Sequence, residues 1–386
     1  MNSKDRYDVV VVGGGPAGST AAALLAKEGF EVCLIEKARF PRQKICAGLI
    51  TLKTIHILQK IFGITYDFLI REGIITHSCR NYSIWNTKKE IAKGSPEFVS
   101  HFVERDRYDE YWANQASNAG ARILMGEKLV SFDLSEKKIV TNQGTSLIGK
   151  WIIGADGIFS RIRHELARRK VIPDSYGDGL APALELRIPK SRSPLFLHYP
   201  VLYYGFNSWG YAWSFPGNDM QTLGMCGLNR KSGVRLRQCF ERFLRFQGIS
   251  SPADCSIKGW AVPYGNYLSK PGGMSTLLIG DAAGFADPVL GEGIYYAHKS
   301  ALLAARAIID TRTRCMDTAA RYAELLSERV LVEMRYAKFW RGIIFSAARM
   351  VNYGVLGILM NRFSKYARET IQGKRTFRWL RSIPTE

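Results

Sequence analysis

A glycine-rich segment near the N-terminus constrains the fold of this chain more than any other feature. Residues 9–12 are four consecutive valines, a run typical of a buried parallel strand. Residues 19–27, rich in Ala and Leu, predict a helix, and residues 30–35 predict a second strand that leads into Glu36. The glycines between the first strand and the helix have the spacing G-x-G-x-x-G and are Gly13, Gly15 and Gly18.

Each residue of this motif has its own task in binding a dinucleotide. Gly13 allows a tight turn, Gly15 lets the backbone approach a pyrophosphate at the helix N-terminus, and Gly18 lets helix and strand pack closely. Glu36, eighteen residues after Gly18, stands where a carboxylate can accept the ribose hydroxyls. Because strand, glycines, helix, strand and acid are in register, we predict a Rossmann-type domain rather than a tight turn without a ligand.

Two later segments place an Asp directly after an apolar strand, predicted over residues 151–153 and 276–279. The residues that follow include Asp156 and Gly157 in the first segment and Gly280 and Asp281 in the second. Such an Asp can face a ligand beyond the carboxyl end of its strand. With these motifs the chain resembles the FAD-dependent oxidoreductases of the para-hydroxybenzoate hydroxylase-like superfamily.

This resemblance implies that the dinucleotide is FAD. It implies that Asp281 meets the ribityl and pyrophosphate part of FAD, and that Asp156 and Gly157 support the flavin site from the side. Arg105, before a predicted helix, matches the Arg that lies along the cofactor in that superfamily. The alternative for Arg105 is a solvated charge at a helix start.

Three further segments resemble geranylgeranyl reductases more closely. Residues 39–48 resemble a loop of that family in which a Cys, here Cys46, and small residues lie beside the flavin ring. Residues 211–216 match the family's Y-x-W-x-F-P motif, and residues 287–294 match its segment after the G-D motif. Together the matches run from the N-terminus to about Ile309, which is most of the chain.

The departures from this family concern the substrate. Ala47 stands where the family often has a second Gly, and residues 224–227, Gly-Met-Cys-Gly, replace a G-x-G. Tyr211, Trp213 and Phe215 alternate, so on a strand they share one face. Core packing is the default for such a stripe; the resemblance implies instead a wall for a long apolar substrate.

The resemblance also implies which residues surround FAD. Cys46 is the candidate catalytic residue, as a reactive thiol or proton donor; the alternative is a small buried hydrophobe. The amides of Gly291 and Gly293 are expected to face the flavin ring and stabilise its negative charge. The expected cofactor-binding residues are Gly13, Gly15, Ala17, Gly18, Glu36, Lys37, Cys46, Ala47, Gly48, Arg105, Asp156, Gly157, Gly280, Asp281, Gly291, Gly293 and Ile294.

The fold class expected is α/β, with a Rossmann-type FAD-binding domain, an interleaved antiparallel substrate sheet and C-terminal helices. The cofactor motifs are separated by aromatic-rich stretches with partial period-two alternation, such as residues 183–188, so the domains are predicted to be discontinuous. The boundaries expected are 1–75, 101–170 and 266–330 for the FAD-binding domain, 76–100 and 171–265 for the substrate domain, and 331–386 for a basic helical region.

Composition supports a globular protein of 386 residues, of which 46% are hydrophobic. The first predicted strand begins near Tyr7, so we expect no signal peptide, and we expect the protein to be cytoplasmic. The seven cysteines contain no C-x-x-C and are expected to be reduced, without a metal site or iron–sulfur cluster. That pattern argues against the electron-transfer-flavoprotein quinone reductases, which carry a cluster domain.

The net charge of +20 is concentrated near the C-terminus, where residues 335–381 hold eleven Lys or Arg and one acid. Residues 342–361 are mostly apolar, but Arg349 within them argues against a transmembrane helix. An apolar helix flanked by cations suits the inner face of an anionic membrane; the alternative is a core-packing helix with a solvated basic face. Nucleic acid is not expected as a partner, because no binding module accompanies the charge.

Three functions compete. The first is reduction of C=C bonds in a polyprenyl chain on a lipid, a quinone or a prenyl diphosphate. The alternatives are a flavin monooxygenase or a flavin-dependent halogenase acting on an aromatic or other small molecule. The Cys46 loop and the Gly-Glu-Gly-Ile segment favour the reductase. No second G-x-G-x-x-G appears, so reduction of the flavin is expected from transient NAD(P)H binding or from a protein or quinol donor.

Overall fold

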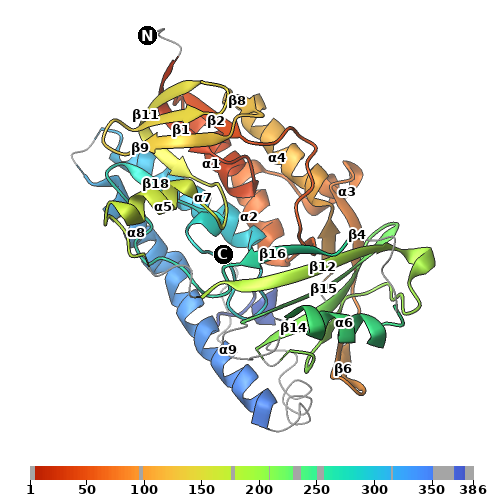
Figure 1. Ribbon diagram of the computed structural model, residues 1–386. Coiled ribbons are helices and arrows are strands. Elements are labelled where there is room, and N and C mark those ends of the chain that lie inside the picture. The colour runs from red at the N-terminus through yellow and green to blue at the C-terminus, as the bar shows by residue number, and fades with distance from the viewer. Residues whose placement is uncertain are drawn as a thin grey trace.

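Two large sheets, with helices around them, make up the computed structural model of this chain (Figure 1). The structure describes residues 5–94, 99–174, 179–207, 209–228, 236–249, 256–313, 316–350 and 369–378.

The first sheet has eight strands, in the order β17-β18-β11-β1-β2-β8, with β10 and β9 continuing from β11. Its strands are β1 (Arg6–Val12), β2 (Val32–Glu36), β8 (Arg122–Met125), β9 (Leu129–Asp133), β10 (Lys138–Thr141), β11 (Ser146–Gly154), β17 (Gly272–Gly273) and β18 (Thr276–Leu278). The central strands are parallel, and Val12 pairs with Ile35 on one side and Gly154 on the other. The four strands predicted beside the glycine and Asp motifs therefore all lie in this sheet, and their four carboxyl ends meet at one edge.

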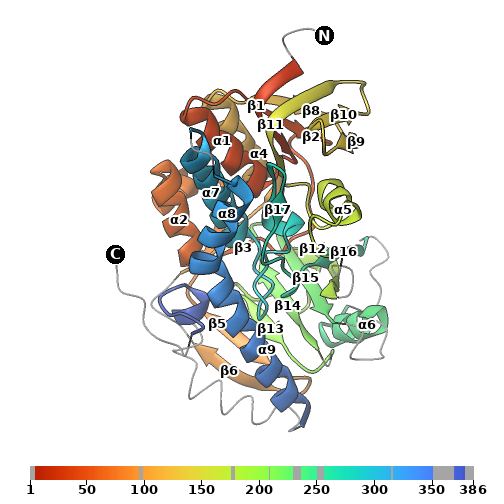
Figure 2. The ribbon, with the colours of Figure 1, turned by 90° about the vertical axis from the view of Figure 1, so that its left-hand side faces the viewer.

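Helices cover both faces of this sheet, with α1 and α7 on one side and α5 on the other (Figure 2). The helices of this part are α1 (Pro16–Lys27), α4 (Arg105–Asn118), α5 (Arg161–Arg168), α7 (Ile294–Thr311) and α8 (Thr318–Leu326). α1 packs between α4 and α7. Its alanines Ala21, Ala22 and Ala23 are fully buried there, and their small side chains allow the close approach of the helices. The valines of β1 lie in the same hydrophobic core.

The second sheet has seven strands, in the order β16-β12-β15-β14-β13-β5-β6. They are β5 (Tyr82–Trp85), β6 (Glu90–Gly94), β12 (Ala181–Pro189), β13 (Val201–Tyr203), β14 (Gly210–Pro216), β15 (Met220–Gly227) and β16 (Lys258–Val262). Every pairing is antiparallel except β13 with β5. α6 (Leu236–Phe246) packs on the face formed by Leu186 and Met225. The opposite face carries Tyr211, Trp213 and Phe215 and is turned toward the first sheet.

A three-stranded sheet and two helices connect the large sheets. They are β3 (Leu49–Ile50), β4 (Ile75–Cys79), β7 (Ser100–Val103), α2 (Leu52–Phe62) and α3 (Tyr66–Arg71). After α8, a π-helical turn (Ser327–Leu331) leads into α9 (Val332–Met350). Short 3₁₀ turns occur at Lys190–Arg192 and Gly280–Ala282.

The C-terminal helices expected from the sequence are present as α7, α8 and α9 within the described part of the chain. The predicted apolar segment, residues 342–361, begins within α9, and its residues 351–361 lie outside the described part of the chain. None of the helices in the described ranges combines the length and the apolar character that a membrane span requires.

Candidate active site

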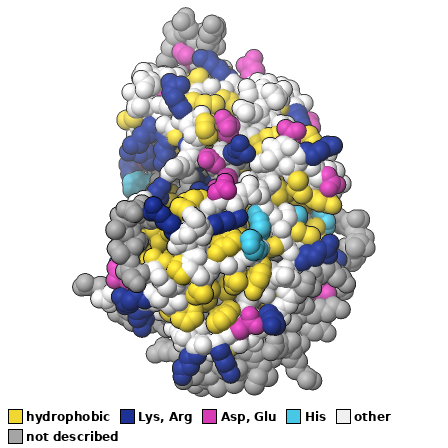
Figure 3. Space-filling model, turned by 90° about the vertical axis from the view of Figure 1, so that its right-hand side faces the viewer, with side chains coloured by type: hydrophobic (Ala, Val, Ile, Leu, Met, Phe, Trp, Pro, Cys, Tyr) yellow, Lys and Arg dark blue, Asp and Glu magenta, His cyan; other side chains and the backbone are white. Residues whose placement is uncertain are grey.

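A cavity of about 630 Å³ lies between the two large sheets. It extends from the N-terminus of α1 to the aromatic face of the seven-stranded sheet, and most of the side chains that line it are apolar. Figure 3 shows a hollow lined by apolar side chains on one face of the molecule, with Lys and Arg side chains around it. The cavity therefore joins the predicted dinucleotide turn to the predicted substrate wall.

The three motif glycines differ in what surrounds them. A Cβ on Gly13, which has φ +106°, would lie 2.4 Å from the Ala155 carbonyl oxygen, and one on Gly18 would lie 1.9 Å from the Gly13 carbonyl oxygen. A Cβ on Gly15 would meet only Arg42 Nη2, at 3.8 Å. Gly13 and Gly18 are thus required by the turn itself, whereas Gly15 borders open space at the N-terminus of α1.

This open space fits the pyrophosphate of a dinucleotide. Gly15, Pro16 and Ala17 line the cavity at the start of α1, where backbone N–H groups and the helix dipole favour an anion. The Arg42 guanidinium lies beside Gly15 and adds positive charge. The turn therefore offers the space and the positive electrostatic environment that a pyrophosphate requires.

Glu36 is buried at the end of β2 and holds the turn in shape. Its Oε2 accepts a hydrogen bond from Gly14 N at 2.8 Å, and its Oε1 accepts one from Ala38 N at 3.0 Å. Arg42 Nε lies 3.5 Å from Oε1. Each carboxylate oxygen retains acceptor capacity for a ribose hydroxyl. Lys37, the next residue, is exposed and does not line the cavity.

The two Asp motifs lie at the edge where β11 and β18 end. Asp156 Oδ2 accepts from Arg161 N at 2.7 Å at the start of α5, and burial raises the Asp156 pKa. Gly157 and Asp281 line the cavity, and Lys44 Nζ lies 3.5 Å from Asp281 Oδ2. Gly280, with φ +55°, is buried in the 3₁₀ turn that leads to Asp281. The structure thus brings Gly157 and Asp281 together at one cavity, with Asp156 and Gly280 behind them.

The loop of residues 39–48 brings Cys46 into contact with Arg105. Cys46, Ala47 and Gly48 line the cavity, and the Cys46 side chain lies close enough to the Arg105 guanidinium to influence its pKa. Arg105 also forms two 2.9 Å hydrogen bonds to Asp109. Burial opposes the charge of Arg105, but Asp109 raises its pKa above the ordinary value. Arg105 is therefore a buried cation of the site and not a solvated charge.

The segment around Glu292 forms the edge of the cavity nearest α7. Gly291, Gly293 and Ile294 line the cavity, and Gly293 caps the N-terminus of α7. The N–H of Gly291, however, donates to the Asp287 carbonyl oxygen at 2.9 Å. The Gly291 amide, one of the two expected to face a flavin ring, is therefore already hydrogen-bonded within its own segment. The Gly293 amide and the first turn of α7 are left to face the ring.

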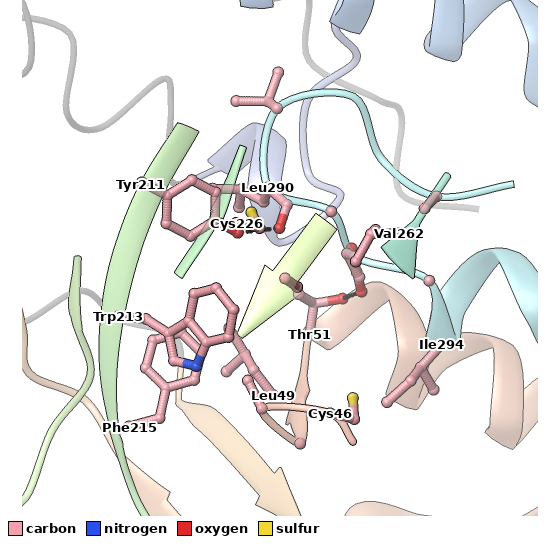
Figure 4. A pocket seen from close by; sticks show the side chains of 18 of the residues that line it. Cys46, Leu49, Thr51, Tyr211, Trp213, Phe215, Cys226, Val262, Leu290 and Ile294 are labelled. Atoms are coloured by element: carbon pink, nitrogen blue, oxygen red, sulfur yellow. Dashed lines mark hydrogen bonds between the residues drawn. The ribbon is translucent and has the colours of Figure 1, made fainter. Parts of the chain in front are cut away.

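Tyr211, Trp213 and Phe215 form one wall of the cavity, and Figure 4 shows Cys46 and Ile294 opposite them. The Tyr211 hydroxyl donates to the Leu290 carbonyl oxygen and thereby ties the wall to the segment before α7. The alternation places all three rings on one face, as the sequence predicts.

Sequence reasoning missed Glu185, which lies on the same wall. Glu185 is 6% exposed and lines the cavity, and the Cys46 main-chain N–H is near enough to its carboxylate to lower its pKa. Burial raises its pKa to about 7. The available signal was the alternation of residues 183–188, which places Glu185 on the face opposite Leu186.

Comparisons with known proteins show which family the chain resembles. A model of the FAD binding domain matches residues 6–179. A menaquinone reductase of Mycobacterium tuberculosis is 31% identical over 348 residues, which is 85% of this chain and 82% of the relative. A geranylgeranyl diphosphate reductase of Rhodobacter capsulatus is 32% identical over 312 residues, which is 78% of this chain and 75% of the relative.

A similar fold has been solved by crystallography. The geranylgeranyl bacteriochlorophyll reductase-like protein of Thermoplasma acidophilum superposes with a TM-score of 0.72 and 23% identity. The match covers 88% of this chain and 87% of that one. The expected fold class is therefore confirmed.

Proposed function

The chain belongs to the geranylgeranyl reductase family of FAD-dependent oxidoreductases, and we propose that it reduces C=C bonds of a polyprenyl chain. The substrate carries this chain on a lipid, a quinone or a prenyl diphosphate. The observation that supports the proposal is the apolar cavity, because it runs from the FAD turn to the wall of Tyr211, Trp213 and Phe215. An extended hydrocarbon gains free energy from such a lining at roughly 25 cal/mol per Å² of buried apolar surface.

When bound, FAD supplies the hydride that is added to one carbon of the double bond. The protein's own task is to hold the chain, exclude water and supply the proton for the other carbon. We propose that Gly15, Ala17 and Asp281 hold the cofactor and that the aromatic wall holds the chain. Arg105 would neutralise negative charge left on Cys46 after the thiol gives up a proton.

The test is anaerobic incubation of the chemically reduced protein with polyprenyl lipids, prenylated quinones and prenyl diphosphates, followed by mass analysis. We expect products that have gained two hydrogen atoms per double bond. Incorporation of oxygen or halogen into an aromatic compound under aerobic conditions, with no hydrogenated product, would instead indicate the monooxygenase or halogenase chemistry.

Cys46→Ala is expected to retain FAD but to lose most of the reduction rate. An isolated alkene has no carbonyl to stabilise charge, so a placed acid is needed, and general acid catalysis typically contributes about 10²–10⁴-fold. The rate is measured with pre-reduced protein, and Cys79→Ala is the matched control, because Cys79 is a thiol outside the cavity lining. An unchanged rate in Cys46→Ala would show that Cys46 only packs.

We further propose that the flavin is reduced by NAD(P)H bound transiently, or by a protein or quinol donor. Stopped-flow reduction by each candidate donor distinguishes these sources.

We also propose the discontinuous division predicted from the sequence, with residues 266–330 completing the FAD-binding domain. The pairing of β18 with β11 supports that division.

We propose that the protein attaches peripherally to an anionic membrane through its C-terminal region. α9 exposes Phe339 and Ile343, and Ile343 also lines the cavity, so the exposed side of α9 adjoins the substrate site. Each Lys or Arg near an anionic surface contributes roughly 1 kcal/mol. Arg341 cannot contribute in this way, because it is buried and donates to the Tyr264 carbonyl oxygen.

Attachment is expected to weaken as salt rises and to leave a salt-resistant remainder from apolar insertion. Co-sedimentation with anionic and neutral liposomes across a salt series measures both parts. Phe339→Ser should lower the salt-resistant part, whereas Phe159→Ser, which changes an exposed Phe beside α5, should not. Absence of the wild-type protein from both pellets at low salt would refute the attachment.

A further inference from the structure

Glu185 lies on β12, the strand next to the edge strand β16 of the seven-stranded sheet, and lines the cavity. Glu185 of β12 pairs with Gly224 of β15, and Gly224 pairs with Trp213 of β14. Directly paired residues of neighbouring strands lie on the same face of a sheet. Glu185 and Trp213 therefore project from the same face, and both line the cavity.

Gly224 lies between these two residues in the sheet and leaves room for the Trp213 indole. A Cβ on Gly224 would lie 2.1 Å from the Trp213 indole, so the ring lies directly over this glycine. Trp213 Nε1 and Glu185 Oε2 are both buried and have no hydrogen-bond partner within the described ranges. Leaving a buried polar atom unpartnered costs about 1–3 kcal/mol, so two such atoms on one apolar wall call for an explanation.

The two cations near Glu185 are Arg187 and Lys258, and each has another partner. Arg187 forms an ion pair with Glu104, and Lys258 donates a hydrogen bond to Gln43. Across the described part of the chain, neither cation forms a salt bridge with Glu185. Burial is the main cause that raises the Glu185 pKa to about 7; Arg187, Lys258 and the Cys46 N–H lower it, and Glu104 raises it. A carboxyl group with this pKa releases and regains protons readily near neutral pH.

We propose that Glu185 is the proton reservoir of the site and returns a proton to Cys46 after each reduction. This inference rests on the proposed function. In each cycle the Cys46 S–H bond breaks and its proton goes to one carbon, while the hydride from reduced FAD goes to the other. The Glu185 O–H bond then breaks, its proton re-forms the Cys46 thiol, and the Glu185 carboxylate regains a proton from water.

The first test needs no substrate. Infrared spectra of the FAD-loaded protein are recorded across a pH series, and we expect a protonated carboxyl band that disappears with a midpoint near pH 7. Glu185→Gln should lack this band, whereas Glu241→Gln, which changes an exposed carboxylate on α6, should keep it. A wild-type protein without such a band would overturn the assignment.

The second test separates a reservoir from a direct donor. Because a raised pKa keeps Glu185 protonated below about pH 7, steady-state turnover should decline above that pH. Glu185→Gln should slow steady-state turnover by about 10- to 100-fold and abolish this decline, and Glu185→Asp should restore part of the rate. A single turnover of pre-reduced protein should be unchanged in Glu185→Gln, since Cys46 is already protonated.

Two kinetic outcomes contradict the proposal. If Glu185→Gln slows the single turnover as much as Cys46→Ala does, Glu185 is the direct donor. If it changes neither the steady-state rate nor the pH profile, Glu185 has no part in proton supply. Should no polyprenyl compound be reduced at all, the proposed function fails, and the infrared titration still decides whether Glu185 titrates near neutrality.

Discussion

Gly15→Leu is expected to give a folded protein that no longer retains FAD. Gly15 has φ −73° and ψ −178°, an extended conformation that any residue adopts, and a Cβ there meets only Arg42 Nη2 at 3.8 Å. The fold therefore tolerates a side chain at this position. A leucine would occupy the place that we propose for the pyrophosphate, and overpacking of about 3 kcal/mol weakens binding by at least about 100-fold.

Flavin absorbance of the purified protein and fluorescence titration with FAD measure this loss, and thermal unfolding without added FAD reports the fold. Gly342→Leu is the matched control, because Gly342 also borders open space but does not line the cavity. Gly18→Ala should differ from both by lowering the unfolding temperature, since its Cβ would lie 1.9 Å from the Gly13 carbonyl oxygen. If Gly15→Leu binds FAD with the parental affinity, the pyrophosphate lies elsewhere.

The contrast among these glycines shows why the cofactor side of the molecule could be predicted from the sequence. The turn, the helix N-terminus and Glu36 fall within one continuous stretch, and each requirement is local: a positive φ, a close approach, or an acid after a strand. Local geometry of this kind leaves a readable spacing. The same holds for Tyr211, Trp213 and Phe215, whose alternation defines a face without any knowledge of the opposite wall.

The role of Glu185 could not be predicted in this way. The alternation of residues 183–188 divides the strand into an apolar face with Leu186 and a more polar face with Glu185. By itself that pattern indicates a strand with one face in the core and one in water. In the folded protein Glu185 is nevertheless buried, and the segments that line the cavity with it, such as the Cys46 loop, lie far away in the sequence.

Lys53 was missed for the same reason, although its ion pair with Glu292 holds the segment beside α7. Lys53 Nζ lies 2.6 Å from Glu292 Oε2, and Thr51 Oγ1 donates to Glu292 Oε1 at 2.7 Å. The ammonium also lies 4.9 Å and 5.1 Å from the ring centroids of Tyr295 and Tyr296. Burial opposes the charge of Lys53, but Glu292 raises its pKa above the ordinary value. Lys53 therefore remains charged in this largely buried pair.

Lys53→Met is accordingly expected to lower the free energy of unfolding by about 3–5 kcal/mol, because it leaves the Glu292 carboxylate buried without its partner. Glu292→Gln should destabilise the protein in the same way by leaving the Lys53 ammonium unpaired. The double variant Lys53→Met/Glu292→Gln removes both charges and should be more stable than either single variant. Chemical unfolding of all four proteins without FAD measures this stability, so that differences in FAD affinity among the variants do not enter the comparison.

FAD affinity should follow stability in this series, because Gly291 and Gly293 flank Glu292 and both line the cavity. Each single variant loses the ion pair and so frees the segment around Glu292 to move. In the double variant, the Gln amide that replaces the Glu292 carboxylate stays within reach of the Thr51 hydroxyl. If the single variants lose less than about 1 kcal/mol, the pair behaves as a solvated surface salt bridge. The segment would then be held mainly by the hydrogen bonds of Tyr211 to Leu290 and of Tyr264 to Val289.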